Sequence, residues 1–383
     1  MKIVVLKSVC PPFDPRIFQK ELKALVNAGH EVTQICPYDK QEDRVSGVRL
    51  LGFPLHTRFI LRPLNWARLW SIMRREPAGA YHFSDPELLP LAWLLARVSG
   101  LPVVFDCFEH YSKAIMSDER FPGFLRPSLA RLYGFLERKI AESLAAVVVP
   151  AIDEKGERRF HQVRRLVLVR NFPWQDTFES LPEEGARKRQ LVYIGDISES
   201  RRGMSSLVEM LSLMHNKDVK LLFIGKVDTP QTQLRLESVA ATTQVSDQFH
   251  LVGEVPYAEI KSYLVESAVG LIPLKAIPRW ETDIPQKMFE YMACRLPFVA
   301  SDLYPPRKFA GETQAGLVVE PQSAQAFADA VDFLLDHPTE ARQMGERGRR
   351  AFLEKYNMEV ESQKLVALYE SLSKETPMPE KDG

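Results

Sequence analysis

A lysine and a glutamate stand three residues apart in the stretch from Pro285 to Asp302, where a short helical pattern runs into an apolar strand pattern. Side chains at this spacing project from the same side of a helix, so Lys287 and Glu290 face one way while Phe289 faces the core. Proline suits the start of a helix, and the free N–H groups there favour a phosphate. One turn further, Glu290 can accept hydrogen bonds from both hydroxyls of a sugar diol. The stretch predicts a nucleotide site; the alternative is a solvated Lys–Glu pair on a surface helix.

A second candidate phosphate-binding group follows the apolar run Leu191–Ile194. Gly195 permits a turn there, and Arg201 and Arg202 come at the start of the next helical pattern. A guanidinium binds phosphate through two parallel hydrogen bonds, and the start of a helix adds its own positive field. Two exposed arginines at the end of a loop are the alternative. Two later apolar runs also end in a glycine, where the backbone must approach something closely: Gly225 and Gly253.

Polar residues follow two apolar runs of the N-terminal half as well. Asp14 and Arg16 come after the first run and can reach a ligand, although Asp14 followed by a proline is also a natural helix cap. His82 and Asp85 follow a later run, and Asp85 is again a natural helix cap. A metal held by His82, Asp85 and Glu87 is disfavoured, because these spacings do not converge across a strand-to-helix turn. We therefore predict no metal site.

The stretch that begins at Pro285 resembles the nucleotide-sugar signature of GT-B glycosyltransferases of family 4, in the subgroup with the pattern Pro-x-Lys-x-Phe-Glu-Tyr-Met-Ala-x-x-x-Pro. The resemblance implies that Glu290 binds the ribose hydroxyls of a donor nucleotide. It also implies that amides at the helix start, around Pro285 and Gln286, bind the diphosphate. The run from Gly195 resembles the glycine-and-cation element of the family, with Arg202 on its cationic position. The loops at Gly225 and Gly253 correspond to those that flank the sugar and the base.

The same resemblance assigns the acceptor side to the N-terminal half. The loop with Asp14 and Arg16 resembles the first strand-to-helix loop of the subgroup. The motif with His82 and Asp85 resembles a second pattern of the subgroup, His-x-x-Asp-Pro-Glu-Leu-Leu-Pro. Residues 57–75 interleave arginine with tryptophan and leucine. Family members that build lipid-linked glycans often dock on a membrane through such a helix. Packing of these apolar side chains in the core is the alternative.

Two positions depart from the family pattern. Relatives usually carry a histidine near the reacting carbon, where this chain has Phe108; Glu109 and His110 follow it and are the candidates for that catalytic role. Thr282 stands where many members place a glutamate that holds the donor sugar. Transfer survives the loss of the histidine if the leaving phosphate itself takes the proton of the acceptor. Otherwise the chain is a nucleotide-sugar-binding or scaffold protein of the same fold; an epimerase or a phosphorylase is a further alternative.

Two arrays of short apolar runs and helical patterns must hold these groups, and the first helix is expected over Glu21–Ala28. Runs of this length between helices predict parallel sheets covered on both sides, so we expect two doubly wound, Rossmann-like domains facing a cleft. The predicted N-terminal, acceptor-side domain covers residues 1–172, a linker covers 173–189, and the nucleotide-sugar-binding domain covers 190–356. A last helical pattern, 357–374, is implied by the resemblance to cross back onto the N-terminal domain.

Composition narrows the class of protein further. Lys plus Arg and Asp plus Glu both number 50 in 383 residues, so no global field attracts nucleic acid. The 4 cysteines form no Cys-x-x-Cys pair, which favours reduced thiols in a cytoplasmic protein. The first apolar run, Ile3–Leu6, is too short for a signal peptide or a membrane span. We expect a cytoplasmic protein that is soluble or sits peripherally on the inner face of the membrane.

These observations lead to one expected function. The chain is expected to move a sugar from a nucleotide diphosphate-sugar to a hydroxyl acceptor, a saccharide or lipid-linked saccharide in polysaccharide synthesis. The resemblance implies retention of the anomeric configuration, with no cofactor beyond the donor as co-substrate. Charge stabilisation of the leaving diphosphate by Arg202 and Lys287, without a metal, is the expected main catalytic effect.

Overall fold

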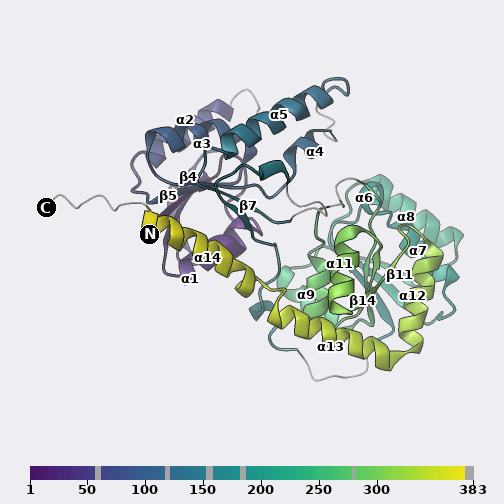
Figure 1. Cartoon of the computed structure of the whole chain (residues 1–383). Coiled ribbons are helices and arrows are strands. Elements are labelled where there is room, and N and C mark those ends of the chain that lie inside the picture. Colours follow the sequence, from purple (N-terminus) through teal and green to yellow (C-terminus); the bar gives the residue numbers. More distant parts are fainter. Residues whose placement is uncertain are drawn as a thin grey trace. The chain divides into compact units, whose positions relative to one another are not determined.

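The computed structural model of the chain describes residues 1–56, 62–116, 121–151, 158–181, 187–277, 280 and 282–375, without the side chains of Pro63 and Arg158. It divides into two compact units (Figure 1). The first unit runs from Met1 to Asn171 and includes the C-terminal segment from Met358 onward; the second runs from Phe172 to Asn357. Residues 182–186 of the predicted linker lie outside the described part of the chain.

The first unit is built on an 8-stranded sheet. Its strands, in spatial order, are β3 (Glu42–Val45), β4 (Val48–Phe53), β2 (Glu31–Pro37), β1 (Lys2–Leu6), β5 (Ala80–Phe83), β6 (Val103–Asp106), β7 (Ala146–Val149) and β8 (Leu166–Leu168). All neighbours pair in parallel except β3 and β4. The strands β1, β5, β6 and β7 are almost wholly buried, which is the reason that they consist of nearly continuous apolar runs.

Helices cover both faces of this sheet. A π-helical turn, η1 (Ile17–Leu22), leads into α1 (Lys23–Asn27), and α14 (Met358–Glu375) packs against these two and β8. The remaining α-helices of the unit among the described residues are α2 (Arg62–Met73), α3 (Leu89–Val98), α4 (Tyr111–Met116) and α5 (Arg126–Ala141). Figure 1 shows α2, α3 and α5 grouped on one side of the sheet, with α1 and α14 on the other.

The second unit is built on a 6-stranded parallel sheet. Its order is β11 (Phe249–Gly253), β10 (Lys220–Ile224), β9 (Gln190–Ile194), β12 (Val269–Ile272), β13 (Phe298–Ser301) and β14 (Gly316–Val319). The α-helices among its described residues are α6 (Glu199–Arg202), α7 (Ser205–Leu213), α8 (Pro230–Thr242), α9 (Tyr257–Glu266), α10 (Lys287–Ala293), α11 (Tyr304–Thr313), α12 (Ala324–Asp336) and α13 (Pro338–Glu354). Two apolar clusters fill the two sides of the sheet. One contains Leu207 and Phe327, and the other contains Phe289 and Tyr291.

The prediction of two parallel, doubly covered sheets is confirmed. Two details differ from the sequence-based expectation. The edge strand β3 was not predicted, because its sequence Glu-Asp-Arg-Val is charged and its antiparallel pairing with β4 leaves it half exposed. The first helix was predicted over 21–28, whereas η1 begins at Ile17, where the carboxylate of Asp14 accepts a hydrogen bond of 2.6 Å from the backbone N–H.

Candidate functional site

Three glycines mark the carboxyl edge of the second sheet. Gly195 and Gly225 directly follow β9 and β10, and Gly253 is the last residue of β11. Their φ angles are 107°, 145° and 88°, in a region that favours glycine. The N–H of Gly195 donates to the carbonyl of Ile224 at 2.9 Å, and that of Gly225 donates to the carbonyl of Gly253 at 2.8 Å. A Cβ on Gly225 would lie 2.2 Å from the carbonyl oxygen of Gly195. The edge is therefore formed by tightly packed backbone.

Lys287, the first residue of α10, points at this edge. Its Nζ lies 3.8 Å from the centre of the Tyr193 ring, and a Cβ on Gly195 would approach Nζ to 3.2 Å. The side chain is 7% exposed, and Nζ has no hydrogen-bond acceptor among the described residues. Burial, reinforced by the charge of Arg202, holds the pKa of Lys287 well below its ordinary value. A buried cation without an acceptor indicates a site for an anion.

Two arginines end α6, and the second of them, Arg202, acts on the charge of Lys287. The guanidinium of Arg202 stands 4.9 Å above the ring of Trp280, and its buried Nε has no partner in the part of the chain that the structure describes. Arg201 is held differently, since it pairs with Asp196 at 3.7 Å and its Nε donates to the hydroxyl of Ser198 at 3.2 Å. Arg202 and Lys287 are thus the two cations of this edge that need an anion most.

Glu290 lies one turn along α10 and is 5% exposed. Its Oε1 accepts a hydrogen bond of 2.9 Å from the hydroxyl of Tyr257 and one of 3.1 Å from the amide of Gln286. Burial raises the pKa of Tyr257, and the adjacent carboxylate of Glu290 raises it further. A carboxylate fixed in this way is ready to accept hydrogen bonds from a diol. Pro285 is buried just before the helix, and Thr282 lies half buried in the preceding turn.

The second unit therefore brings together most of the predicted donor-side residues: Gly195, Arg201, Arg202, Gly225, Gly253, Lys287, Gln286 and Glu290. Sequence reasoning missed the aromatic side chains Tyr193, Tyr257 and Trp280 that hold the charged groups. The pattern Gly253-Glu-Val-Pro256 before Tyr257 was noticed as a strand end, but nothing in the sequence linked that tyrosine to Glu290.

In the first unit, Asp14 and Asp85 bind backbone. The Oδ1 of Asp14 accepts from the N–H groups of Arg16 and Ile17, which is the capping alternative, and its Oδ2 pairs with the ammonium group of Lys7. The Oδ2 of Asp85 accepts from the N–H of Ser8 at 2.7 Å and that of Val9 at 2.9 Å. Asp85 makes no side-chain cap to the short helix after it. Its carboxylate ties the loop after β1 to the end of β5.

Arg16 and His82 are also engaged inside the first unit. The guanidinium of Arg16 donates to both oxygens of Asp106, at 3.0 and 3.1 Å, and contacts Glu21 at 2.9 Å. His82 is fully buried, and its Nδ1 shares a hydrogen bond of 2.8 Å with the hydroxyl of Tyr369 on α14. Burial lowers the pKa of His82 to about 4, so the ring is neutral. Both side chains therefore face inward and are held by internal contacts, and an acceptor-side role for Arg16 and His82 stays a prediction.

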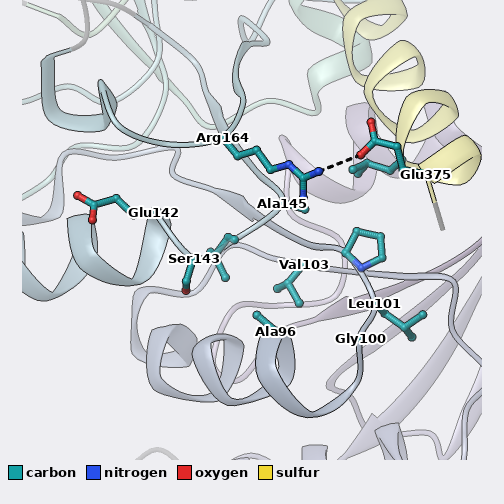
Figure 2. A pocket seen from close by; sticks show the side chains of 12 residues that line it. Ala96, Gly100, Leu101, Val103, Glu142, Ser143, Ala145, Arg164 and Glu375 are labelled. Carbon is teal, nitrogen blue, oxygen red and sulfur yellow. Dashed lines mark hydrogen bonds and ion pairs between the residues drawn. The ribbon is translucent and has the colours of Figure 1, made fainter.

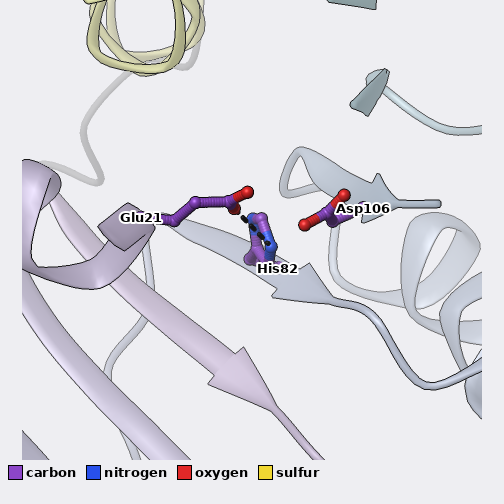
Figure 3. A group of neighbouring side chains, drawn as sticks. All are labelled: Glu21, His82 and Asp106. Atoms are coloured by element: carbon purple, nitrogen blue, oxygen red, sulfur yellow. Dashed lines mark ion pairs between the residues drawn. The ribbon is translucent and has the colours of Figure 1, made fainter. Parts of the chain in front are cut away.

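Figure 3 shows Glu21, His82 and Asp106 turned toward one another. One possible ligand atom from each lies within 4.8 Å of the others. However, the guanidinium of Arg16 contacts both carboxylates and supplies the positive charge that a metal ion would bring. The cluster is therefore an internal ion-pair network. The set His82, Asp85 and Glu87 does not converge either, since Glu87 pairs with Arg62 at 2.8 Å.

The loop after β6 carries the departure from the family pattern. The ring of Phe108 packs edge-on against Tyr111 at 5.9 Å, and the hydroxyl of Tyr111 donates to the carbonyl of Ser84 at 3.3 Å. His110 is half buried, and its Nδ1 lies 3.1 Å from the hydroxyl of Ser112. Burial, with smaller effects of nearby cations, lowers the pKa of His110 to about 4. Glu109, which lies between Phe108 and His110 in the sequence, is also half buried.

A pocket at the opposite, amino edge of the first sheet does not take part in this chemistry. It lies at the starts of β6 and β7, and Arg164 and Glu375 form an ion pair of 3.4 Å across it (Figure 2). None of the predicted site residues lines it.

The predicted membrane segment, residues 57–75, lies partly outside the described chain, since residues 57–61 are not described. In its helical part, α2, the side chains of Trp66 and Trp70 pack against the core of the first unit. Among the described residues, no helix combines the length and apolar character needed to cross a bilayer.

Comparisons with known proteins agree with this geometry. The family described as glycosyl transferase 4-like domain matches residues 16–171, and the family described as glycosyl transferases group 1 matches residues 188–337. A phosphatidyl-myo-inositol mannosyltransferase of Mycolicibacterium smegmatis is 23% identical over 361 residues, which cover 92% of this chain and 88% of that protein.

Two solved structures share the fold. Sucrose-phosphate synthase of Thermosynechococcus elongatus gives a TM-score of 0.75 at 18% identity, with 97% of this chain and 99% of that chain covered. The HepE protein of Anabaena, solved with UDP, gives 0.73 at 12% identity, with 97% and 100% covered. The fold is GT-B, and the two family matches together span most of the chain. The chain therefore belongs to the GT-B glycosyltransferases. Its N-terminal half matches the glycosyl transferase 4-like domain, and its C-terminal half matches the glycosyl transferases group 1 family.

Proposed function

We propose that the chain transfers a sugar from a nucleoside diphosphate-sugar to a hydroxyl acceptor, without a metal and with retention of the anomeric configuration. One observation carries the proposal: Lys287 is a buried cation with no acceptor among the described residues, at the glycine-lined edge where β9 ends. A donor diphosphate would supply the missing acceptors. Retention rests on the resemblance to family 4.

The leaving diphosphate is the group that most needs stabilisation, because negative charge develops on it as the bond to the sugar breaks. Lys287 and Arg202 are fixed beside aromatic rings before any ligand arrives. Charges held in place cost no reorganisation at the moment of reaction, which makes such stabilisation effective. In this role the two side chains replace the divalent ion of metal-dependent transferases.

Glu290 is proposed to bind the ribose of the donor. Its Oε1 is oriented by Tyr257 and Gln286, so the carboxylate does not have to be ordered when the nucleotide binds. The solved structure of HepE with UDP makes uridine diphosphate the first nucleotide to test.

A hydroxyl of a saccharide or of a lipid-linked saccharide is the proposed acceptor. The name of the mycobacterial relative, which mannosylates a phosphatidyl-myo-inositol, supports this class. We propose a cytoplasmic location, in keeping with the free state of all 4 cysteines.

A second function, binding of a nucleotide sugar without transfer, is favoured by one observation. Phe108 stands where the resemblance to family 4 implies a histidine, and its ring packs on Tyr111. On this alternative the second unit binds a donor as above and no sugar is moved.

A thermal-shift screen against UDP, GDP and ADP sugars, followed by measurement of donor hydrolysis, tests the proposal. We expect one class of donor to raise the melting temperature and to be turned over slowly even without an acceptor. In Glu290→Ala the stabilisation should fall strongly, since hydrogen bonds to a charged group contribute about 1.5–3 kcal/mol. Stabilisation without turnover, also in the presence of an acceptor panel, would favour the binding protein. No stabilisation by any donor would refute both functions.

A further inference from the structure

Two neighbouring helices of the first unit carry large apolar side chains on their outer surfaces. On α5, Leu132 and Phe135 are 55% and 52% exposed, and Leu136 is exposed beside them. These positions are three and four residues apart, so they form one ridge. On α3, which packs against α5, the exposed apolar residues are Trp93, Leu94 and Val98. Figure 1 shows both helices on the side of the sheet opposite α14.

The ridge continues beyond the start of α5. Phe124 is 81% exposed, more than any other large apolar residue described, and Leu125 beside it is exposed as well. An apolar surface of this extent is uncommon on a protein that has no partner for it. We call the outer surfaces of α3 and α5, together with Phe124 and Leu125, the α3–α5 surface.

Cations flank the apolar side chains of this surface. Arg131 and Arg138 are exposed on α5 within one turn of Phe135, whereas Lys139 pairs at 2.8 Å with Glu142, which directly follows the helix. On α3 the guanidinium of Arg97 lies 3.8 Å above the ring of Trp93. The two helices together contain one acidic residue, Glu137, which is fully buried. The surface is therefore both apolar and positively charged.

The nature of this charge decides between two occupants. A second copy of the chain docked through a two-fold axis would bring these cations against the same cations of the partner, which opposes association. An anionic lipid surface meets both properties, because apolar side chains enter the acyl boundary while arginine and lysine bind headgroup phosphates.

The helix α2 differs from α3 and α5 in how its large apolar side chains are placed. The two tryptophans of α2 pack against the core, and Leu64 is the exposed large apolar residue described on that helix. Among the described residues of the first unit, most of the exposed large apolar side chains lie on α3, on α5 and just before α5.

We propose that the α3–α5 surface docks the protein peripherally on membranes rich in anionic lipid. The inference does not depend on sugar transfer, and it assigns the contact to α3 and α5 where the sequence had indicated residues 57–75.

Co-sedimentation of the full chain with two kinds of vesicle tests the proposal: phosphatidylcholine alone, and phosphatidylcholine mixed with an equal part of phosphatidylglycerol. We expect binding to the mixed vesicles that weakens as salt is raised. Replacing Leu132, Phe135 and Leu136 by serine should lower the partition coefficient at least about tenfold, since binding scales with the apolar area buried. The double variant Arg131→Glu with Arg138→Glu should lower binding to the mixed vesicles and leave any binding to pure phosphatidylcholine unchanged.

The matched control replaces two exposed leucines of the second unit, Leu213→Ser with Leu234→Ser, which should leave vesicle binding unchanged. Circular dichroism melts would verify that each variant folds. The proposal is overturned if the wild-type chain does not bind the mixed vesicles, or if the control loses as much binding as the α5 variant. A third outcome would identify a different occupant. If the wild-type chain does not bind vesicles and light scattering shows a dimer that the α5 variant abolishes, a second copy of the chain covers the surface.

Discussion

At the scale of single residues, Lys287 stands out because its burial opposes folding. A buried ammonium group without an acceptor loses hydration and gains only the contact with the Tyr193 ring in return. Arg202 adds repulsion. An arrangement that weakens the free protein is retained where it serves a ligand, so stability and binding should respond to Lys287 in opposite directions.

Replacement of Lys287 by methionine is predicted to stabilise the free protein and to weaken nucleotide binding. Methionine fills a similar volume without a charge, and substitutions of this kind typically add about 0.5–2 kcal/mol to the free energy of unfolding. The affinity for UDP should fall at least about thirtyfold, because the diphosphate loses a buried charge partner worth roughly 2 kcal/mol or more. Urea unfolding and calorimetry measure the two effects. Lys220→Met, at an exposed lysine that begins β10, is the control and should change neither quantity.

The pH dependence of UDP binding should report the titration of Lys287. Burial holds its pKa well below the usual 10.5, and a bound diphosphate favours the protonated form. The affinity is therefore highest below this lowered pKa and is lost as the pH rises through it. In Lys287→Arg the cation does not titrate, so its profile should stay flat over the same interval. A wild-type profile as flat as that of the arginine variant would contradict the role of Lys287.

His110 is predicted to act on the acceptor as a neutral ring. Because burial lowers its pKa to about 4, the ring does not gain charge between pH 7 and pH 5, and activity should show no loss from this group in that interval. His110→Ala should lower transfer by about a hundredfold or more if the ring positions or deprotonates the acceptor, while UDP affinity, carried by the second unit, stays unchanged. Transfer at the wild-type rate would instead leave the proton to the departing phosphate.

At the residue scale, the sequence is informative where the residues concerned are close in the chain. The spacing of Lys287 and Glu290 could place both on one short helix, and both lie on α10. The inward roles of Arg16 and His82 could not be predicted, because they depend on Asp106 and Tyr369, which lie 90 and 287 residues away.

At the scale of elements, a buried polar network joins the C-terminal helix to the first sheet. Tyr369 on α14 reaches His82 on β5, and the backbone N–H of Arg170 donates to Glu361 at 2.9 Å. These bonds fix α14 to its unit in addition to apolar contacts. The resemblance around His82 and Asp85 thus marks residues that hold the fold.

Tyr369→Phe is predicted to lower the free energy of unfolding by about 1–3 kcal/mol, because it leaves the buried Nδ1 of His82 without its partner. Equilibrium unfolding in urea, followed by circular dichroism, measures the loss. The same change on α11, Tyr304→Phe, is the control. Equal losses in the two variants would show that the bond to His82 contributes nothing.

The sequence predicted the central strands well because they are buried on both faces and consist of continuous apolar runs. It failed for β3, whose charged residues carry no strand pattern and whose position is decided by pairing with β4. It also placed the start of the first helix too late, because the π-helical turn at Ile17 depends on a cap from Asp14.

At the scale of the whole molecule, the charged groups proposed for the donor all belong to the second unit. Substitutions in the first unit should therefore change transfer without changing nucleotide affinity. The proposed catalytic charges are side chains, so donor turnover should persist in EDTA. Turnover that requires added magnesium or manganese would contradict the roles given to Arg202 and Lys287.

The most direct test of sugar transfer is the release of nucleoside diphosphate, in EDTA, from the donor that stabilises the protein. We predict that the wild-type chain releases it, that an acceptor accelerates the release, and that Lys287→Met does not release it. Phe108→His is the decisive comparison, because it introduces the histidine that the resemblance to family 4 implies at this position. Release by the histidine variant alone, with the wild-type chain binding the same donor and leaving it intact, would contradict the proposal and identify the natural protein as a binding protein.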